Sequence, residues 1–456
     1  MTVAIVGLGR MGRAVAAALA QRGIALVACD DRPTDAHAEL AERHGFRFVG
    51  APDRGQLEEL VGGSDEVLPT PGLAETHPVF DVAARAGVPV ISEFDLAARW
   101  DERPVVAITG TNGKTTVTMM VTAMLDASGR RAAAVGNTDI PLVEALDDPA
   151  TEVFVVEASS FRLAASQRFR PSVATWLNFT PDHLDVHRSL GHYEAAKARI
   201  WADQTSGDTA IGNLDDPVVS RHLASCAAAR LGYSIDATAA ADGLASPALA
   251  LAGCYRLDGE RLVADDGTTI VRSGELTRAL PHDVSNALAA AATARAAGAS
   301  WDGVRSVLRS WTVPAHRVSL VAEAGGIRYY DDSKATTPHA VLAALAGFPS
   351  AVLIAGGQNK GLDLSVLAEA ADRVRAVVAI GACAHEVVTV FEGRCPVIEA
   401  ASMDEAVRAA RAAARPGDAV LLSPGTASFD WYANYGERGD DFARAVRALI
   451  GAGEAG

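Results

Sequence analysis

The chain has 456 residues, enough for about three domains at roughly 150 residues each. With 49% hydrophobic and 21% charged residues, its composition is that of a globular protein, which excludes a disordered or fibrous chain. The 56 acidic residues outnumber the 41 basic ones and give a net charge of −15, so nucleic acid is not an expected partner, because a phosphate backbone is bound by a basic surface.

The first predicted elements are a strand over 3–6, the glycine turn GLGRMG and a helix over 13–21. Asp30 follows the next apolar run, 24–29. This spacing matches the dinucleotide fingerprint, in which glycines let the backbone approach a pyrophosphate and the acid binds a ribose hydroxyl. The pattern also fits a tight turn in a Rossmann-like domain that binds another ligand or none. These residues alone leave NAD binding open.

A second strand over 105–108 leads into the loop TGTNGKTT and a helix over 117–127. Gly110 and Gly113 allow backbone amides to surround a phosphate, Lys114 can reach the β- and γ-phosphates, and the Thr115 hydroxyl can bind Mg²⁺. Ile108 stands where the strict motif has its first glycine. The run still predicts ATP binding.

Acids and histidines follow the next apolar strands. Glu157 ends the run FVVE, and His183 lies in TPDHLD after the apolar run 173–179. Mg²⁺ prefers carboxylate, hydroxyl and water ligands, so Glu157 is the natural ligand and His183 a less typical one. Taken separately, each residue is more often structural. Lys197, on a predicted helix, is most simply a solvent-facing lysine.

The second half of the chain predicts hairpins or irregular structure over 243–277, a helix beginning near Asn286, and a third strand over 351–354 followed by two glycines. Dense polar loops occur in DDSKATT after the strand 327–330, in GGQNKG around Lys360, and in SPGTASFD around Ser428. Such loops suit carboxylate or other anion binding, although a polar turn accounts for the first of them equally well.

Apolar runs alternate with Ala-rich helices from end to end, which indicates α/β layers around parallel sheets. Charged or proline-containing turns place the domain boundaries, giving predicted domains over 1–101, 102–312 and 313–456. Five scattered cysteines form no CxxC pair, no apolar run reaches the roughly 18 residues of a membrane helix, and Met1 leads directly into a strand. We therefore expect a soluble, cytoplasmic protein with no signal peptide and no membrane span.

With these motifs in this order, the chain resembles the Mur ligases, the ATP-dependent amide-forming enzymes of peptidoglycan precursor synthesis. The resemblance covers nearly the whole chain, and it is strongest to the members that add D-glutamate. It rests on GLGRMG, SDEVLPTPGL with ETHP, TGTNGKTT, GNTDIP, VEASSFRL, NFTPDHLD, YEAAKARI, SNALAA, HRV, DDSKATTPH, GGQNKG and LLSPGTASFDWYANYGERGDDF.

The resemblance implies an N-terminal Rossmann-like domain for a UDP-sugar, a central P-loop ATPase domain, and a C-terminal Rossmann-like α/β domain for the incoming amino acid. It implies ATP contacts at Gly110, Thr111, Asn112, Gly113, Lys114, Thr115, Thr116, Asn286, Arg317 and Asp332. It implies UDP-sugar contacts at Gly9, Arg10, Met11, Asp31, Arg32, Gly72 and Asn137, and D-glutamate contacts at Lys334, Thr336, Lys360, Ser428 and Tyr435.

The resemblance also implies a catalytic set of Lys114, Glu157, His183 and Lys197. Two Mg²⁺ ions would be held by Thr115, Glu157, His183 and Lys197, the lysine being carbamylated by CO₂. His183 is also a candidate for helping the D-glutamate amine lose its proton.

The implied function is that of a monomeric ligase that adds D-glutamate to UDP-N-acetylmuramoyl-L-alanine through an acyl phosphate, with ATP as co-substrate. Three alternatives remain: a sibling Mur-type or folylpolyglutamate-type amide ligase with another amino acid or carboxylate, an NAD-dependent oxidoreductase, and a non-catalytic paralogue. An oxidoreductase leaves TGTNGKTT unexplained. A non-catalytic protein need not keep together the five residues Lys114, Glu157, His183, Lys197 and Lys334.

The chain departs from the family pattern in four places, which involve five residues. Met11 replaces a usual Ser or Thr, which removes a hydroxyl from the diphosphate end, and Thr138-Asp139 replace Ile-Gly beside Asn137. Ala158 replaces Leu after Glu157, and Thr337 replaces Asn after DSKAT. The first two concern nucleotide-sugar contacts and the last concerns the shape of the amino-acid pocket, whereas none touches the phosphate-transfer set.

Overall fold

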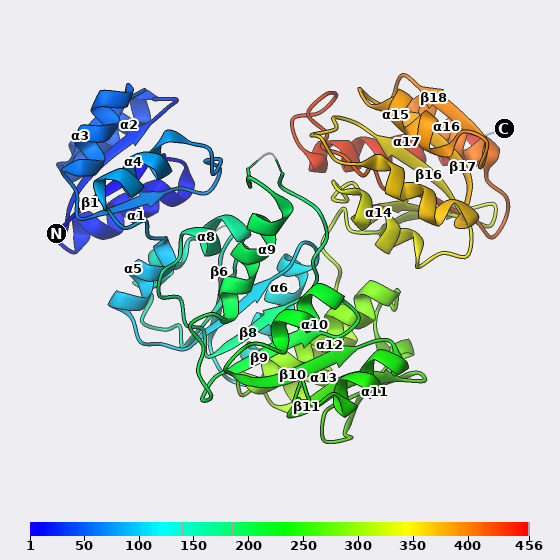
Figure 1. Cartoon of the computed structure of the whole chain (residues 1–456). Coiled ribbons are helices and arrows are strands. Elements are labelled where there is room, and N and C mark those ends of the chain that lie inside the picture. The colour runs from blue at the N-terminus through cyan, green and yellow to red at the C-terminus, as the bar shows by residue number, and fades with distance from the viewer. Residues whose placement is uncertain (139, 185, 455–456) are drawn as a thin grey trace. The chain divides into compact units, whose positions relative to one another are not determined.

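The computed structural model describes residues 1–138, 140–184 and 186–454 (Figure 1). The chain forms two compact units, one of Met1–Thr277 with Ser285–Ser310, and one of Arg278–Val284 with Trp311–Gly456. Asp139 and Asp185, which belong to two of the sequence motifs, lie outside the described residues. Within the described residues, the strands form three sheets of four, nine and six strands. The predicted α/β class is therefore confirmed.

The first sheet has the order β3-β2-β1-β4, and all its strands are parallel. Its strands are β1 (Thr2–Val6), β2 (Ala25–Asp30), β3 (Arg47–Gly50) and β4 (Glu66–Pro69), and the helices around it are α1 (Arg10–Gln21), α2 (Asp35–His44), α3 (Arg54–Gly62), α4 (Pro78–Ala86) and α5 (Glu93–Trp100). Helix α1 begins three residues earlier than its predicted start, because Gly9 is its N-cap and the glycine turn leads directly into the first helical turn.

The second sheet has the order β13-β12-β11-β10-β9-β8-β5-β7-β6, parallel from β11 to β6 and antiparallel at β12 and β13. The predicted hairpins over 243–277 are these antiparallel strands. The strands are β5 (Val105–Thr109), β6 (Ala132–Gly136), β7 (Val153–Glu157), β8 (Val173–Trp176), β9 (Thr209–Asn213), β10 (Ala229–Ser234), β11 (Gly253–Asp258), β12 (Arg261–Val263) and β13 (Thr269–Arg272).

Helices follow most of these strands. They are α6 (Lys114–Asp126), α7 (Leu142–Ala145), α8 (Ser160–Ala165), α9 (Leu190–Ala198), η1 (Arg199–Trp201), α10 (Pro217–Leu223), α11 (Ala237–Ala245), η2 (Ser273–Glu275), α12 (Pro281–Ala296) and α13 (Trp301–Ser310). Helix α12 begins five residues before its predicted start, at Pro281, where proline's missing N–H costs no helical hydrogen bond.

The third sheet has the order β14-β15-β19-β16-β17-β18, with β14 antiparallel to β15 and the other pairs parallel. Its strands are β14 (Ser319–Ala324), β15 (Ile327–Asp331), β16 (Ala351–Gly356), β17 (Val374–Ile380), β18 (Val397–Ala400) and β19 (Ala419–Leu422). Its helices are α14 (Pro338–Leu345), η3 (Leu364–Arg373), α15 (Ala384–Phe391), α16 (Met403–Ala413) and α17 (Tyr435–Glu454). Helices α15 and α16 both pack on β17 (Figure 1).

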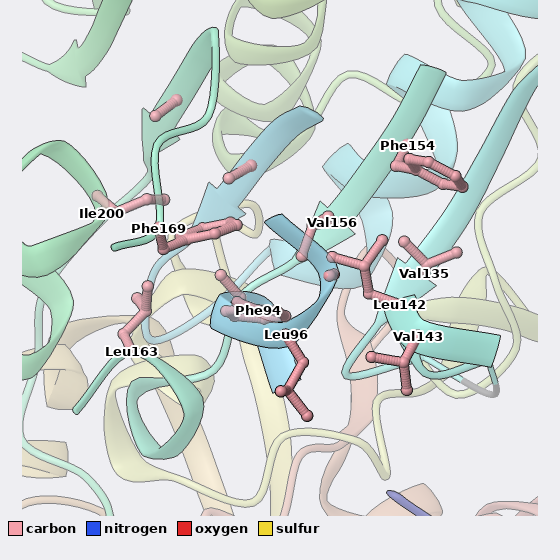
Figure 2. Packing of buried hydrophobic residues seen from close by; sticks show 14 of the residues in the cluster. Phe94, Leu96, Val135, Leu142, Val143, Phe154, Val156, Leu163, Phe169 and Ile200 are labelled. Atoms are coloured by element: carbon pink, nitrogen blue, oxygen red, sulfur yellow. The ribbon is translucent and has the colours of Figure 1, made fainter. Parts of the chain in front are cut away.

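A hydrophobic cluster joins α5 to the second sheet. Phe94 of α5 is fully buried and stacks on Phe169, with ring centroids 4.5 Å apart. Figure 2 shows Phe94 among Phe154 and Val156 of β7 and Leu142 of α7. Burying each such side chain contributes about 1.5–3 kcal/mol. The connection between the first two sheets is therefore part of the core of the first unit.

Candidate active site

The loop TGTNGKTT joins the end of β5 to α6 and has the shape of a phosphate cradle. Gly113 is the N-cap of α6 with φ +85°, a backbone conformation that favours glycine. A Cβ at this position would lie 2.7 Å from Oδ1 of Asn286, so the loop and α12 require glycine here. The Lys114 ammonium donates to the carbonyls of Gly110 and Thr111, at 2.8 and 2.9 Å. Loop amides, a helix N-terminus and a cation thus converge where a phosphate can bind.

Asn178, after β8, holds this loop in place, and sequence reasoning missed it. Its Oδ1 accepts from the N–H groups of Thr111 and Asn112 at 3.0 and 2.8 Å, and its Nδ2 donates to the Asn112 carbonyl at 3.1 Å. The Thr111 hydroxyl lies 3.1 Å from the hydroxyl of Tyr193 on α9. Two signals pointed to Asn178. It begins the motif NFTPDHLD, and it follows an apolar strand next to β5, where polar side chains meet the ligand edge of a parallel sheet.

Lys197 is not the solvent-facing lysine that its sequence context indicates. Its side chain is 1% exposed, and its Nζ donates to the Gly110 carbonyl at 2.7 Å. Burial, together with the nearby Lys114 charge, holds the pKa of Lys197 well below its usual value. The structure therefore brings Lys197 to the phosphate loop and disfavours its charged form.

Glu157, at the end of β7, presents one free carboxylate oxygen. Its Oε1 accepts from Asn137 Nδ2 at 3.1 Å, whereas Oε2 is buried without a hydrogen-bond partner among the described residues. A buried, unpartnered carboxylate oxygen is costly unless a ligand completes it. Asn137, a predicted UDP-sugar contact after β6, thus lies beside the predicted metal ligand.

His183 has φ +55°, an uncommon conformation for a residue other than glycine. Its ring lies 4.9 Å from the ring of Phe161 and 6.0 Å from that of Tyr193, measured between centroids. Its Nε2 lies 3.4 Å from Oδ2 of Asp182. In the described part of the chain, no three His, Cys, Asp or Glu side chains group closely enough to hold a metal ion by themselves. A metal ion bound here thus needs ligands other than His, Cys, Asp and Glu side chains in addition to Glu157 and His183.

The glycine turn of the first sheet uses Asp30 as a structural group. The Asp30 carboxylate accepts from the N–H groups of Leu8 at 2.6 Å and Arg32 at 2.8 Å, one on each oxygen. It therefore ties the turn to the 30–32 segment instead of offering a free carboxylate to a ribose, which argues against the NAD interpretation.

The other predicted UDP-sugar residues lie around this turn. Met11 is buried, Asp31 Oδ2 lies 3.1 Å from His77 Nε2, and Gly72 has φ +111° with open space where a Cβ would project. Gly9 and Arg10 begin α1, and Arg32 is exposed. These positions surround the carboxyl ends of β1, β2 and β4, the usual ligand edge of such a sheet.

In the second unit, the predicted D-glutamate residues lie on loops after β15, β16 and β19, which are neighbours in the sheet. The Lys334 ammonium lies 3.9 Å from the ring centroid of Tyr435, and the Lys360 ammonium lies 4.9 Å from that of Phe429. Gln358 and Ala427 pair through their backbones, so the Lys360 loop is joined to the loop of Ser428. Thr336 lies on the first of these loops. The loops thus place two ammonium groups after neighbouring strands of one sheet.

Arg438 of α17, which sequence reasoning also missed, forms hydrogen bonds to two of these loops. It is 1% exposed and donates to Ser333 Oγ and the Ser333 carbonyl at 3.0 and 2.9 Å, and to the carbonyls of Thr426 and Ala427 at 3.1 Å each. Burial lowers the pKa of Arg438 to about 10, which still leaves it charged near neutral pH. One guanidinium thus fixes the loop of Lys334 against the loop of Ser428.

The predicted ATP residues fall into both units. Asn286 lies beside the phosphate loop, whereas Arg317 and Asp332 belong to the second unit. Asp332 accepts from Ser423 Oγ at 2.7 Å and from the Val318 N–H at 3.2 Å. Burial raises the pKa of Asp332 to about 7 against these hydrogen bonds.

A phosphate loop at the ligand edge of one parallel sheet, with a strand-end carboxylate and a buried lysine beside it, defines an α/β enzyme that uses a nucleoside triphosphate. Comparison with known families gives three matches in succession. These are the MurD-like N-terminal domain of Mur ligases over residues 1–92, the Mur ligase middle domain over 108–294, and the Mur ligase glutamate ligase domain over 316–425. The chain belongs to the Mur ligase family.

Curated relatives agree over the full length. The chain is 42% identical to the UDP-N-acetylmuramoylalanine–D-glutamate ligase of Frankia casuarinae, over 99% of this chain and 95% of the relative. It is 41% identical to the protein of the same name from Thermobifida fusca, over 98% of each chain. The family inferred from the motifs, and the ligase class that it implies, are therefore confirmed.

Solved structures support the fold. A pseudomurein peptide ligase type C from Methanothermus fervidus superposes with a TM-score of 0.61 at 17% identity, covering 98% of this chain and 99% of the other. UDP-N-acetylmuramate–alanine ligase MurC from Thermotoga maritima superposes with a TM-score of 0.57 at 18% identity, covering 98% of this chain and all of the other. The predicted three-domain Mur ligase architecture is confirmed, whereas the individual domain ranges stay predictions.

Proposed function

We propose that this chain joins D-glutamate to UDP-N-acetylmuramoyl-L-alanine at the expense of ATP, in cytoplasmic peptidoglycan precursor synthesis. One observation carries the proposal: a phosphate loop with buried Lys197 and half-paired Glu157 beside it stands in the same chain as two lysines on loops that follow neighbouring strands of another sheet. The two relatives named above carry the corresponding name.

The phosphate loop supports the first chemical step. The carboxylate of the UDP-sugar substrate attacks the γ-phosphorus of ATP, the bond to the β-γ bridging oxygen breaks, and ADP leaves an acyl phosphate. The loop amides and the ammonium of Lys114 would neutralise the charge that this transfer crowds together. Asn286 would support the loop from α12.

The two lysines of the second unit support the second chemical step. Lys334 and Lys360 would bind the carboxylates of D-glutamate, with Thr336, Ser428 and Tyr435 completing the pocket. The amine attacks the acyl carbon, loses a proton, and the tetrahedral intermediate expels inorganic phosphate to leave the amide. His183 would accept or relay that proton.

The residues present fit a divalent cation. Glu157 offers a buried, unpartnered carboxylate oxygen. Burial lowers the pKa of Lys197 and so favours the neutral amine, which can add to CO₂ and release a proton, giving a carbamate oxygen. Thr115, Glu157, His183 and carbamylated Lys197 would hold two Mg²⁺. When bound, Mg²⁺ supplies charge neutralisation at the transferring phosphoryl group.

The remaining proposals concern where and how the chain acts. Its five cysteines are free thiols, which suits the reducing cytoplasm. None of the helices in the described part of the chain combines the length and apolar character of a membrane span. The chain would work as a monomer on small-molecule substrates alone.

Phosphate release tests the function. ATP, Mg²⁺ and UDP-N-acetylmuramoyl-L-alanine are combined with D-glutamate, L-glutamate, glycine, L-alanine, L-lysine or meso-diaminopimelate. We expect release only with D-glutamate and only when the UDP-sugar is present, and K114A is the matched inactive control. Release with another amino acid would assign the chain to a sibling ligase and direct attention to Thr337, whose buried Oγ1 has no partner among the described residues. Release that needs neither substrate would contradict the proposal.

A further inference from the structure

Glu75 uses its carboxylate, its carbonyl and its N–H in hydrogen bonds to one other segment of the chain. It lies between β4 and α4 in the 70–77 loop, the loop that carries Gly72. Its carboxylate accepts from the Arg188 N–H at 3.0 Å and contacts Nδ1 of His187 at 2.7 Å and Nδ1 of His192 at 3.0 Å. Its carbonyl accepts from the Arg188 guanidinium at 2.9 and 3.2 Å, and its N–H donates to the Val186 carbonyl at 2.9 Å. One residue thus contacts both ends of the 186–192 segment.

His187 carries this contact inward. Its side chain is 1% exposed, and its Nε2 lies 2.9 Å from the hydroxyl of Ser160, the first residue of α8. When the imidazole is neutral, Nδ1–H donates to the Glu75 carboxylate and Nε2 accepts from Ser160, because an ionised carboxylate can only accept. The Glu75 carboxylate is ionised near neutral pH, since hydrogen bonds from Arg188 and both histidines outweigh the effect of burial and lower its pKa.

The same residue reaches the phosphate-transfer residues through the backbone. The His187 N–H donates to the His183 carbonyl at 2.9 Å, and α8 begins three residues after Glu157. The His187 ring stacks on Phe161, with centroids 5.4 Å apart and planes at 15°, and Phe161 in turn contacts the His183 ring. The orientation of His187 therefore sets the placement of His183 and of the start of α8.

The 70–77 loop is also tied to the nucleotide-sugar side. His77 Nε2 lies 3.1 Å from Oδ2 of Asp31, and the loop contains Gly72. Both Asp31 and Gly72 are expected UDP-sugar contacts. A single short loop thus connects the expected UDP-sugar residues, through Glu75, to the segment that carries His183.

We propose that Glu75 is a positioning residue that, through His187 and Ser160, couples UDP-sugar binding in the 70–77 loop to the placement of the phosphate-transfer residues. This inference rests on the proposed function for its kinetic readout. Glu75 touches no expected reacting atom. Its effect passes through a buried histidine whose ring nitrogens both have partners, so losing the carboxylate frees His187 to turn or to change tautomer.

The test compares E75L, E75Q and H187A with the wild type in the phosphate-release assay, with KM measured for each substrate. We expect E75L to lower kcat at least tenfold and to raise KM for the UDP-sugar at least fivefold, with KM for ATP and D-glutamate within twofold of wild type. E75Q keeps an acceptor for His187, so its kcat and its KM for the UDP-sugar should lie between those of E75L and the wild type. E39Q removes an exposed carboxylate from helix α2, which follows β2 of the same sheet, and is the matched control.

A double-mutant cycle separates positioning from general loss of structure. If Glu75 acts through His187, the E75L/H187A double variant should be within twofold of the worse single variant, because the second change removes nothing further. Fold losses that multiply, or an E75L enzyme within twofold of wild type in kcat and in every KM, would overturn the inference. Far-UV circular dichroism and thermal melting establish whether each variant is folded. If E75L is not folded, E75Q replaces it in the comparison and in the double variant.

Calorimetric binding of UDP-N-acetylmuramoyl-L-alanine without ATP gives a readout that needs no turnover. E75L should bind at least fivefold more weakly than wild type and E39Q, and equal affinities would contradict the coupling. A wild type that binds the UDP-sugar but releases no phosphate with D-glutamate would contradict the proposed function and still leave this binding comparison decisive for Glu75.

Discussion

At the scale of single residues, Lys197 combines burial, a lowered pKa and a position at the phosphate loop. A neutral buried amine can form a carbamate with CO₂, which replaces a cation by a carboxylate-like group. We therefore expect K197A to lose at least 100-fold in kcat, taken as about 3 kcal/mol of transition-state stabilisation, and to recover part of it in formate or acetate.

The check is phosphate release by K197A at increasing formate and acetate concentrations. The matched control is K114A, whose lost group is a cation, so a small carboxylate should not restore it. Failure of both anions to restore K197A would leave the carbamate without support, and equal rescue of K114A would mark the effect as a general salt effect.

Asp332 gives a pH dependence of stability. Its pKa is about 7 in the folded chain because of burial, against 3.8 for an ordinary Asp. Between these values the folded state binds more protons than the unfolded state, so the Asp332 contribution to the free energy of unfolding is fully present below pH 3.8 and is lost as pH rises through 7. At about 1.4 kcal/mol per unit, the loss is on the order of 4 kcal/mol.

The neutral variant D332N should remove this dependence. Relative to wild type, D332N should gain stability between pH 5 and pH 8 and change little below pH 4, when both proteins are unfolded with urea at each pH. Parallel curves for the two proteins across that range would contradict a raised pKa at Asp332.

Position after an apolar strand pointed to the phosphate loop, Glu157 and the loop of Ser428, because the carboxyl ends of parallel strands share one edge of a sheet. The family resemblance supplied most of the other predicted site residues. The sequence context alone also misled in one case. It misjudged Lys197, although a signal existed. Tyr193 and Ala196 are buried on α9, and Lys197 lies four residues after Tyr193 and so on the same helix face. For a lysine on a helix, an apolar stripe around it predicts burial better than its charge predicts exposure.

At the scale of elements, strand order decides which loops meet, and the sequence did not show it. Strand β19 is last in the chain but inserts between β15 and β16. This insertion brings the Ser428 loop between the loops of Lys334 and Lys360. Crossover pairing of this kind depends on tertiary packing, whereas the individual strands follow from local apolar runs, as Ala419–Leu422 did.

Arg438 shows how a helix fixes two such loops, and its geometry can be tested. R438K keeps the charge but cannot span the Ser333, Thr426 and Ala427 acceptors together. Leaving buried carbonyls unpaired costs about 1–3 kcal/mol each. We expect KM for D-glutamate to rise at least tenfold, with KM for the UDP-sugar within twofold.

Steady-state kinetics with each substrate varied in turn measures this effect. R447K, at an exposed position of the same helix, is the control and should match wild type. An R438K enzyme whose KM values all change equally, or not at all, would show that the guanidinium does not hold the amino-acid pocket.

At the scale of the whole molecule, the chemistry is divided between the two compact units. The phosphate loop, Glu157 and Lys197 belong to the first, and Lys334, Lys360 and Ser428 belong to the second. The acyl carbon formed in the first step must come within bonding distance of an amine held by the second unit. Turnover therefore requires substrate binding to bring both sets of residues to the same reacting atoms, as lid and domain closure does in other enzymes.

Small-angle scattering tests this requirement. We expect the radius of gyration to fall when a non-hydrolysable ATP analogue and UDP-N-acetylmuramoyl-L-alanine are added together. The predicted ATP contacts include Arg317 and Asp332 of the second unit as well as the phosphate loop of the first, so the nucleotide shifts the population toward the closed form. The UDP-sugar alone should change the radius less, because all its predicted contacts belong to the first unit. A protein with the two ligands bound, as shown by calorimetry, and an unchanged scattering profile would contradict closure. In that case the two units would keep one arrangement whether or not these ligands are bound.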